Sequence, residues 1–377
     1  MQKGNKQMMQ IEEVNSKETE AKFLSVADFV YQDDKNWVKP LMVEELAIFN
    51  PEENVFFKSG KAFRWLLKSE NNYIGRIAAF VSNIHTAEPK GGIGFFECIN
   101  DKKAAFALFD VAKEWLRSQG VKGMDGPINL GENDNNWGLL VKGFTTPAYG
   151  MSYNPPYYQE IFEAYGFEKR YEQYTNHFDI LKGLPDRFRK IAKRVKSNPS
   201  LSFRHLEKAK TASYLRDLEK VYNQAWEKHE DYQPIDYDYL LSSFKKMKSF
   251  VEEDLIWFAY AEGKPIGFIV CVPDINQVIK NLNGKLNVWN KLKFLYYVKT
   301  KKVKRLRVLV MGVIPDYQNR GIESGLIDHC FHAAQKLTQY HEAELSWVGS
   351  FNDKMMALHK ASGATLGKVH ITYRYNF

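Results

Sequence analysis

The segment from Arg307 to Asp328 contains the residues whose types and spacing best suit chemistry. An apolar strand is expected to end at Val313, because Pro315 cannot continue it. Residues 318–321, with the sequence Gln-Asn-Arg-Gly, then form a turn that leads directly into a helix. The first backbone N–H groups of a helix have no internal partner and lie at the positive end of its dipole. This turn therefore predicts an anion site that suits a diphosphate.

The same turn resembles the acyl-coenzyme A loop of the GNAT superfamily of N-acyltransferases, whose motif is Q/R-x-x-G-x-G/A. Glu323 departs from this motif, since a carboxylate there would repel phosphates unless it turned outward or Arg320 offset it. The resemblance implies that acetyl-CoA or another acyl-CoA binds here and that no metal takes part. The cofactor-binding residues that it implies are Met311, Gly312, Val313, Gln318, Asn319, Arg320, Gly321, Ile322, Glu323 and Ser324.

A second part of the GNAT pattern lies downstream, where a strand is followed by Asn and then a helix. Asn352 and His359 occupy its Asn and Tyr positions, and Leu358 and Gly363 also match. In many family members the Tyr protonates the departing thiolate, and a histidine can act as an acid near neutral pH. The resemblance thus implies catalytic roles for Asn352 and His359. Glu344 is a possible base for an acceptor amine, and a packing role is the alternative for both His359 and Glu344.

Two parts of the chain each contain a strand, a long amphipathic helix and a further strand. In the first part these are Ile93–Cys98, Lys102–Ser118 and Gly123–Asn129, and in the second part Val308–Val313, Ile322–Leu337 and Glu344–Gly349. Such a unit is a right-handed crossover in a mixed sheet, so the fold class is α/β. Together with this repeat, the resemblance to the GNAT superfamily implies two tandem GNAT-like domains, each a mixed, largely antiparallel twisted sheet flanked by helices.

The first half lacks a glycine turn between its strand and its helix. Asn100 or Asp101 is expected to cap that helix instead. We predict a degenerate GNAT-like domain at residues 1–183, a basic linker or helix at 184–200, and a GNAT-like domain with the acyl-CoA loop at 201–377.

The stretch Gly126–Tyr158 is rich in Asn, Tyr and Pro. It favours a polar and aromatic pocket wall, with a loop held by its own turns and ring packing as the alternative. The substrate-binding candidates are Asn129, Asn133, Tyr149 and Tyr153. Together with GRIAAF and PDINQVIKNLNGKL, this stretch makes nearly the whole chain resemble a widespread bacterial family of tandem GNAT proteins.

The composition limits the possible classes of protein. The 377 residues carry a net charge of +8, which suits an anionic partner such as a nucleotide cofactor, an acidic carrier protein or RNA. Basic residues gather at Arg187–Lys196 and Lys285–Arg307. Because the apolar runs are too short to span a bilayer, and Cys98, Cys271 and Cys330 lack metal or disulfide spacing, we expect buried thiols in a cytoplasmic protein without a membrane partner.

Three functions remain open. The first is transfer of an acetyl or longer acyl group from acyl-CoA, or from an acyl carrier protein, to an unknown amine. The second is a catalytically inactive GNAT-fold module that binds a metabolite or a protein, which Glu323 and the missing Tyr would suit. The third is a Fem-type transferase that uses aminoacyl-tRNA; the basic patches would suit RNA, but they lack an RNA-binding pattern, so nucleic acid is the less favoured partner.

Overall fold

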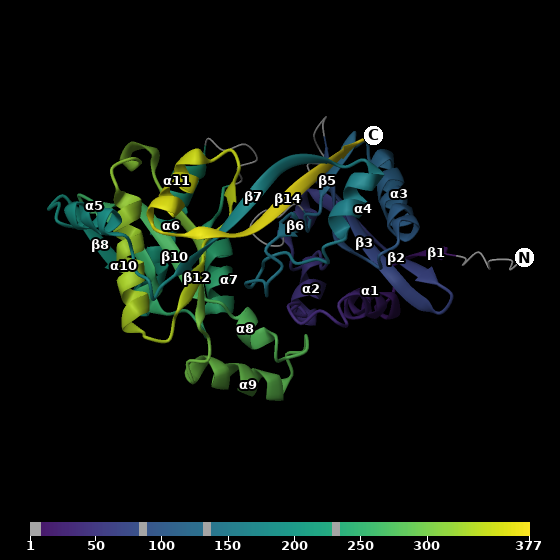
Figure 1. Ribbon diagram of the computed structural model, residues 1–377, viewed down its shortest axis with the longest axis horizontal. Helices are drawn as coiled ribbons and strands as arrows, with labels where there is room; N and C mark the ends of the chain where they lie inside the picture. The colour runs from purple at the N-terminus through teal and green to yellow at the C-terminus, as the bar shows by residue number, and fades with distance from the viewer. Residues whose placement is uncertain (1–8, 83–88, 131–136, 228–233) are drawn as a thin grey trace, which may run out of the picture.

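The computed structural model describes residues 9–82, 89–130, 137–227 and 234–377. In these residues fourteen strands form one sheet, in the order β1-β2-β3-β4-β5-β14-β7-β12-β11-β10-β9-β8, with β6 beside β14 and β13 beside β7. Figure 1 shows the N-terminal half on the right, the C-terminal half on the left, and the long strands β7 and β14 running between them. The predicted α/β class with helices flanking mixed sheets is confirmed, and the two sheets are continuous.

Both halves contain strands and helices. The strands are β1 (Met9–Glu13), β2 (Gly60–Ser69), β3 (Asn72–Ser82), β4 (Lys90–Cys98), β5 (Gly123–Gly126), β6 (Leu139–Lys142), β7 (Glu168–Asp179), β8 (Leu201–His205), β9 (Ile256–Ala261), β10 (Lys264–Pro273), β11 (Arg305–Val313), β12 (Glu342–Glu344), β13 (Val348–Gly349) and β14 (Thr365–Asn376). The α-helices are α1 (Lys17–Val30), α2 (Met42–Ile48), α3 (Lys102–Ser118), α4 (Tyr158–Tyr165), α5 (Asp186–Lys196), α6 (Thr211–Trp226), α7 (Tyr237–Met247), α8 (Asn276–Ile279), α9 (Val288–Lys299), α10 (Ile322–Lys336) and α11 (Asp353–Ala361).

Helix α3 begins and ends where its sequence pattern predicts. Asp101 is the N-cap, and its carboxylate accepts hydrogen bonds from the backbone N–H groups of Lys103 and Ala104. This satisfies two donors that the helix cannot pair internally. Leu108, Ala112 and Leu116 lie on its buried face and are fully buried. Local sequence therefore suffices to place this helix.

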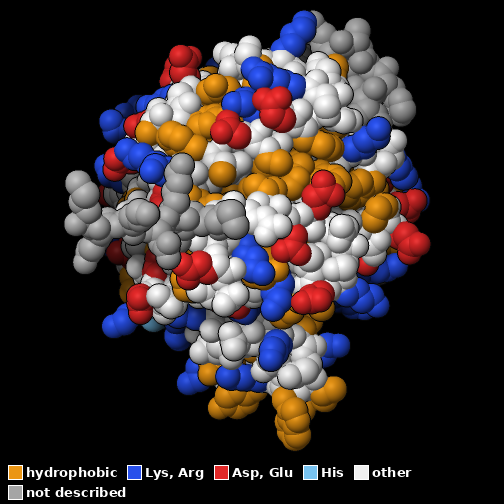
Figure 2. Space-filling model, turned by 90° about the vertical axis from the view of Figure 1, so that its right-hand side faces the viewer, with side chains coloured by type: hydrophobic (Ala, Val, Ile, Leu, Met, Phe, Trp, Pro, Cys, Tyr) orange, Lys and Arg blue, Asp and Glu red, His pale blue; other side chains and the backbone are white. Residues whose placement is uncertain are grey.

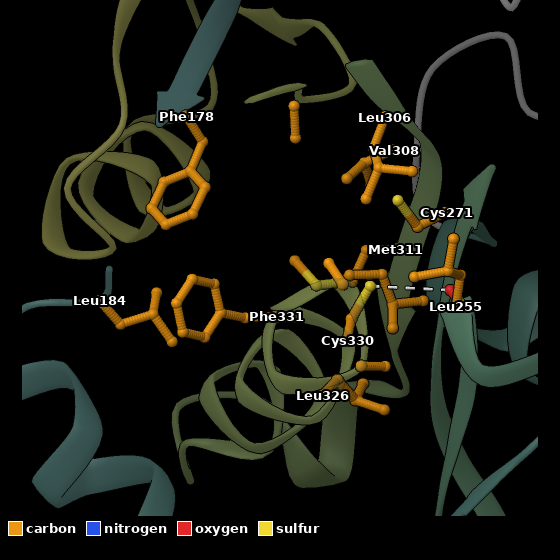
Figure 3. Packing of buried hydrophobic residues seen from close by; sticks show 14 of the residues in the cluster. Phe178, Leu184, Leu255, Cys271, Leu306, Val308, Met311, Leu326, Cys330 and Phe331 are labelled. Carbon is orange, nitrogen blue, oxygen red and sulfur yellow. Dashed lines mark hydrogen bonds between the residues drawn. The ribbon is translucent and has the colours of Figure 1, made fainter. Parts of the chain in front are cut away.

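Each half has its own apolar core. In the N-terminal half α3 and α4 pack on the sheet, with Phe109 and Phe162 at the centre. In the C-terminal half α10 covers one face of the sheet, and Figure 3 shows Phe331, Leu326 and Met311 packed there. Helices α6 and α7 cover the opposite face. All three cysteines are free and buried, as predicted.

The two halves exchange strands at their junction. β7 of the N-terminal half pairs with β12, where His177 lies opposite Glu344. β14 at the C-terminus pairs with β5, where Tyr373 lies opposite Gly126, and Tyr373 belongs to the N-terminal core. The division of the chain at residues 184–200 stays a prediction. Although β14 falls in the predicted C-terminal domain by sequence, its last residues pack in the N-terminal half.

The predicted basic linker contains the helix α5. Its Phe188 and Val195 lie in the same core as α10, and Lys196 forms an ion pair with the buried Asp328 of α10. This helix is therefore an integral layer of the C-terminal half.

Candidate active site

Strand β11 carries a bulge and then separates from its neighbour. Against β10, Val270 lies opposite Val310 while Cys271 lies opposite Val308, so Leu309 is the additional residue. On its other side β11 runs parallel to β12, and the last aligned pair is Arg307 and Glu344. Bulges of this kind are common beside active sites.

The pairing of β11 with β12 ends at that last pair. The chain after Glu344 turns to β7, where the backbone N–H of Leu345 donates to Asn176 O at 2.9 Å. Among the described residues no strand pairs with the 308–313 part of β11 on this side. Exposed strand edges present backbone groups that can pair with an extended ligand. We refer to the space beside residues 308–313 as the C-terminal notch.

The Gly321 turn joins the end of β11 to α10. Gly321 is the N-cap of α10 with a φ of 81°, and as a glycine it has no side chain that could cap this helix. Gln318 Nε2 donates to Val313 O at 3.0 Å and so fixes the turn to the end of β11. The first amides of α10 therefore have the arrangement that binds anions.

Helix α5 packs against this turn from outside. A Cβ atom added to Gly321 would lie 2.9 Å from Val195 Cγ2 and 3.2 Å from Ile191 Cγ2. Glycine is thus required here both by the left-handed backbone and by the proximity of α5. The same helix carries the basic residues of the 187–196 stretch.

Glu323 lies in the first turn of α10, at the position that departs from the motif. Burial raises the pKa of its carboxyl group, and a hydrogen bond with its own backbone N–H partly offsets the rise. The carboxylate therefore uses one of the amides that a phosphate would need. An anionic ligand at this turn has to displace the Glu323 side chain.

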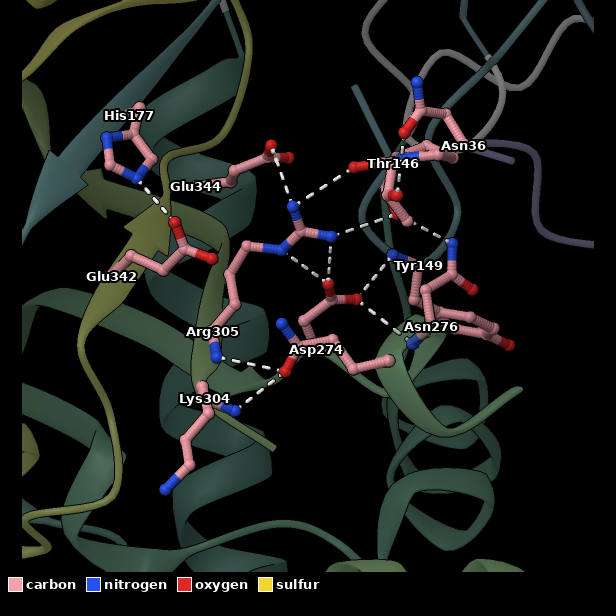
Figure 4. Close-up of polar contacts among 12 residues, drawn as sticks. Asn36, Thr146, Tyr149, His177, Asp274, Asn276, Lys304, Arg305, Glu342 and Glu344 are labelled. Carbon is pink, nitrogen blue, oxygen red and sulfur yellow. Dashed lines mark hydrogen bonds and ion pairs between the residues drawn. The ribbon is translucent and has the colours of Figure 1, made fainter. Parts of the chain in front are cut away.

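Glu344 sits at the apex of the C-terminal notch in a network of buried charges. Its Oε1 forms an ion pair with Lys368 Nζ and lies 3.5 Å from Arg305 Nη1. Arg305 Nε donates to Asp274 Oδ2 at 2.7 Å, and its Nη1 donates to Thr146 O at 3.1 Å. Asp274 Oδ1 also accepts from Tyr149 N at 2.8 Å. Figure 4 shows this network, which attaches the 146–149 loop of the N-terminal half to the C-terminal half.

Beside this network the middle of the sheet presents a row of polar side chains, all of them buried except the half-exposed His177. His177, Thr175 and Gln173 alternate along β7, and the aligned residues Lys368 and His370 alternate along β14. These residues share one face of the sheet, because alternate strand residues point to the same side. Trp137 covers the row, with its ring 5.8 Å from the ring of His370.

Several atoms in this row are buried and have no hydrogen-bond partner within the described chain. They are Trp137 Nε1, Gln173 Nε2, Thr175 Oγ1, Glu344 Oε2 and His370 Nδ1. Burying a polar atom without a partner costs about 1–3 kcal/mol, so such atoms are usually satisfied by water or a ligand. We call the side chains of these five residues, together with Lys368, the polar site.

The hydrogen bond of His370 identifies its tautomer. Its Nε2 lies 3.1 Å from Ser152 O, and a carbonyl oxygen can only accept, so Nε2 carries the proton. Nδ1 then has a lone pair and points into the polar site. Burial lowers the pKa of His370 to about 4, so the ring is neutral at neutral pH.

An aromatic wall from α6 lies on the same face of β11. A Cβ atom added to Gly312 would lie 2.4 Å from Trp226 Cζ3, so only glycine admits this ring. The Trp226 ring stacks on Tyr222 with 4.5 Å between centroids. By contrast, Met311 and Val313 point into the core beneath α10.

The three predicted catalytic residues, Asn352, His359 and Glu344, do not lie together in the structure. His359 lies on the α10 side of the sheet, where its Nδ1 accepts from Asn176 Nδ2 at 3.0 Å, and burial lowers its pKa to about 4. A ring that is neutral at neutral pH is a poor proton donor. Asn352 caps α11 by accepting from Met355 N at 3.1 Å. Of the three candidates, Glu344 is the one that reaches the polar site.

The predicted substrate residues of the 126–158 stretch are engaged within the chain. Asn129 Oδ1 accepts from Phe95 N at 3.0 Å, Tyr149 donates to Glu44 at 2.7 Å, and Tyr153 donates to Asp34 at 2.7 Å. Asn133 lies outside the described residues. The residues of this stretch that contact the polar site are instead Trp137, whose ring lies beside His370, and Ser152, whose carbonyl oxygen accepts from His370.

Sequence reasoning missed His370, Gln173 and Thr175. The available signal was polar residues at every second position of two long strands, Gln173-Thr175-His177 in the mostly polar β7 and Lys368-His370-Thr372 in the more apolar β14. Polar alternation usually marks a solvent-facing side. Here both faces of these strands are covered, so the same pattern marks a buried site.

Comparison with known proteins agrees with this geometry. Residues 215–364 match the acetyltransferase (GNAT) family. The chain is 29% identical over 312 residues to Protein YghO of Escherichia coli (strain K12), covering 78% of this chain and 76% of that protein. It is 28% identical over 361 residues to a bacterial ceramide synthase of Caulobacter vibrioides (strain NA1000 / CB15N), covering 93% of each.

Among solved structures, a tandem GNAT protein from the clavulanic acid biosynthesis pathway is similar in fold. It superposes with a TM-score of 0.59 at 10% identity, over 98% of each chain. That likeness extends the GNAT fold from the matched segment to both halves. Residues 215–364 therefore match the acetyltransferase (GNAT) family, and the chain as a whole has the fold of two GNAT-like domains in tandem.

Proposed function

We propose that this protein is an N-acyltransferase that moves an acyl group from acyl-CoA to an amine at the C-terminal notch. The observation that carries the proposal is the position of the polar site. Its unpartnered Glu344 Oε2 lies at the apex of the notch, where β11 leaves β12. GNAT proteins as a superfamily use acyl-CoA, and the Gly321 turn lies at the far end of the same strand.

The fit of acyl-CoA follows from three parts of the chain. The amides at the start of α10, with Arg320 and the basic α5 nearby, would hold the diphosphate. The unpaired edge of residues 308–313 would pair with the extended amide arm, and backbone N–H groups at the bulge would polarise the thioester carbonyl. Bound acyl-CoA supplies an activated acyl group. The Glu323 carboxylate is the one feature that opposes this fit.

The polar site is suited to an amine that also carries an oxygen acceptor. Glu344 Oε2, Thr175 Oγ1 and His370 Nδ1 can accept hydrogen bonds from the amine, and Gln173 Nε2 and Trp137 Nε1 can donate to an oxygen. Glu344 would orient the amine and take its proton as the nitrogen attacks the thioester carbon. The C–N bond then forms, the C–S bond breaks, and the thiolate leaves with a proton from solvent.

A second candidate function is a binding module without catalysis. The hydrogen bond between Glu323 and its own amide favours it, because it occupies the anion position of the turn. In that case acyl-CoA would bind weakly or not at all. The aminoacyl-tRNA-dependent alternative stays a prediction.

Calorimetric titration with acetyl-CoA and longer acyl-CoAs separates these functions. Acyl transfer requires binding, and the charge reversal Arg320→Glu should weaken it while Lys182→Glu, the same change at a distant exposed side chain, should not. Binding should also raise the unfolding midpoint. No heat and no midpoint shift at millimolar acyl-CoA would leave the binding module as the surviving function.

Release of free thiol in the presence of candidate amines then tests the reaction. The panel includes amino alcohols, amino acids and the long-chain amines that become ceramides, because one relative is named a ceramide synthase. Thiol release that depends on one amine and disappears in Glu344→Gln supports the proposal. Release that is equal without any amine would indicate hydrolysis instead.

A further inference from the structure

Helix α9 lies at the outer edge of the C-terminal half, at the lower end of Figure 1. None of its side chains is buried. One face holds it to the body: Asn290 Nδ2 donates to Leu282 O at 2.9 Å and to Lys285 O at 2.8 Å, and Phe294 packs against the cores. The helix is thus attached on one side and free to meet a partner on the other.

The outward face of α9 is apolar. Its side chains are exposed by 71% at Val288, 79% at Trp289, 54% at Leu292, 39% at Leu295 and 60% at Tyr296. Helical spacing of three and four residues places all of them on one stripe. Figure 2 shows hydrophobic side chains projecting at this lower end of the molecule with basic side chains around them. A contiguous exposed apolar stripe marks an interaction surface.

The charges around the stripe have one sign. The stretch Lys285–Arg307 holds nine Lys or Arg and no Asp or Glu. By helical geometry Lys291 and Lys293 lie on opposite sides of the apolar stripe. Lys299 lies beyond its C-terminal end. Arg305 and Arg307 are buried in the body, so the lysines provide the surface charge.

We propose that α9 docks this protein on an anionic lipid surface, with the helix in the plane of the membrane. An apolar stripe flanked by lysines is the pattern of an interfacial helix, and Trp and Tyr favour the headgroup region. A second copy of the chain fits the stripe less well, because two α9 helices would bring their lysines together.

A helix that docks on a membrane surface does not have to span the bilayer. Within the described ranges no helix is long and apolar enough to span a bilayer, and α9 has 12 residues. The sequence-based expectation of no membrane partner considered spanning segments, whose length requirement does not apply to a helix that lies in the interface. The proposal is also independent of the proposed acyl transfer, because lipid binding can be measured without turnover.

Flotation of the full chain with lipid vesicles tests the proposal. We expect binding to vesicles of phosphatidylcholine with phosphatidylglycerol, and at least about tenfold less to phosphatidylcholine alone, since each lysine near an anionic surface contributes to affinity. Trp289→Glu/Leu292→Glu and Lys291→Glu/Lys299→Glu should each lower the binding at least about tenfold. The matched control Val55→Glu/Leu181→Glu changes two side chains exposed by 64% and 72% elsewhere and should bind normally.

Three outcomes would overturn the proposal. One is the absence of binding to the anionic vesicles at low salt. Another is binding that both α9 variants retain while their unfolding midpoints match the parent chain. The third is a concentration-dependent dimer that Trp289→Glu/Leu292→Glu dissociates, because the stripe would then be covered by a second copy.

Discussion

In both halves a bulge interrupts the strand that leads into the long helix. In the N-terminal half Arg76 lies opposite Glu97 while Ala78 lies opposite Gly94, and Phe95 takes a φ of 50° at the bulge. In the C-terminal half the additional residue is Leu309. β4 and β11 therefore carry a β-bulge at corresponding places in the two halves.

The space beside the bulge is used differently in the two halves. In the N-terminal half Ile128 N donates to Ile93 O at 2.7 Å and Asn129 Oδ1 accepts from Phe95 N at 3.0 Å, so the chain itself fills the notch. Asp101 likewise caps α3 with its carboxylate. In the C-terminal half no described strand pairs with the corresponding strand edge, and the N-cap Gly321 has no side chain, although the Glu323 carboxylate accepts from its own backbone N–H.

This difference teaches how one fold can serve two purposes. A bulged strand and a helix N-terminus leave backbone groups that need partners. Where the chain supplies the partners, the half becomes a rigid support. Where it does not, those groups remain available to a ligand.

The largest effect is expected at Glu344. Glu344→Gln keeps the shape of the side chain but removes its charge, so acyl-transfer kcat/KM should fall about 10²-fold or more. The measurement is thiol release with saturating acyl-CoA, on protein whose unfolding midpoint is known. Glu342→Gln is the control: it lies on the same strand and pairs with His177 at 2.8 Å, outside the polar site. Equal losses in both variants would remove Glu344 from the chemistry.

A pH-dependent effect is expected at Glu97, which lies beside the N-terminal bulge. Burial raises the pKa of Glu97 to about 7, although Arg76 opposes the rise. Because the folded chain holds this proton more tightly than the unfolded chain, the stabilising contribution is full below pH 4.5 and is lost as pH rises to about 7. That loss amounts to up to about 3 kcal/mol. Urea unfolding of the parent chain and of Glu97→Gln should diverge across this interval, and parallel profiles would show that Glu97 does not titrate there.

A smaller effect on stability is expected from Asn129→Ala. It leaves the backbone N–H of Phe95 buried without its acceptor, which should lower the free energy of unfolding by about 1–3 kcal/mol. Acyl-CoA affinity should stay the same, because the N-terminal notch has a packing role. Calorimetric titration checks this second part, and a large loss of affinity would place a ligand in the N-terminal half.

The smallest effects are expected at the two helix starts. Glu323→Ala frees the amide of α10 and removes a repulsive charge, so acyl-CoA affinity should rise about tenfold. Asp101→Ala removes a cap from α3 and should cost about 1 kcal/mol of stability without changing affinity. Weaker acyl-CoA binding by Glu323→Ala would mean that the carboxylate helps the ligand, which reverses the role assigned to it here.

Much of the local structure could be predicted from the sequence. The helix Lys102–Ser118, its Asp101 cap and the strand–turn–helix around Gly321 follow from periodicity, capping and glycine placement, which act within a few residues. The GNAT fold was also evident from the motif and the repeat. Within the polar site, Glu344 was the one residue that could be anticipated.

The exchange of β7 and β14 could not be predicted. Gln173 meets His370 across 197 positions of the chain, and nothing near either residue specifies the other. His359 was predicted from its place in a motif to take part in the chemistry. Its contact with Asn176 places it on the face of the sheet opposite to the polar site.

The two long helices, the glycine turn, the duplicated order of elements and the basic stretches could be read from the residues alone, because these features depend on neighbours along the chain. The tertiary structure decided which polar residues share a buried face, which notch the chain fills and which face of α9 stays exposed. Those features depend on strand register and layer packing, in which distant residues compete for the same space.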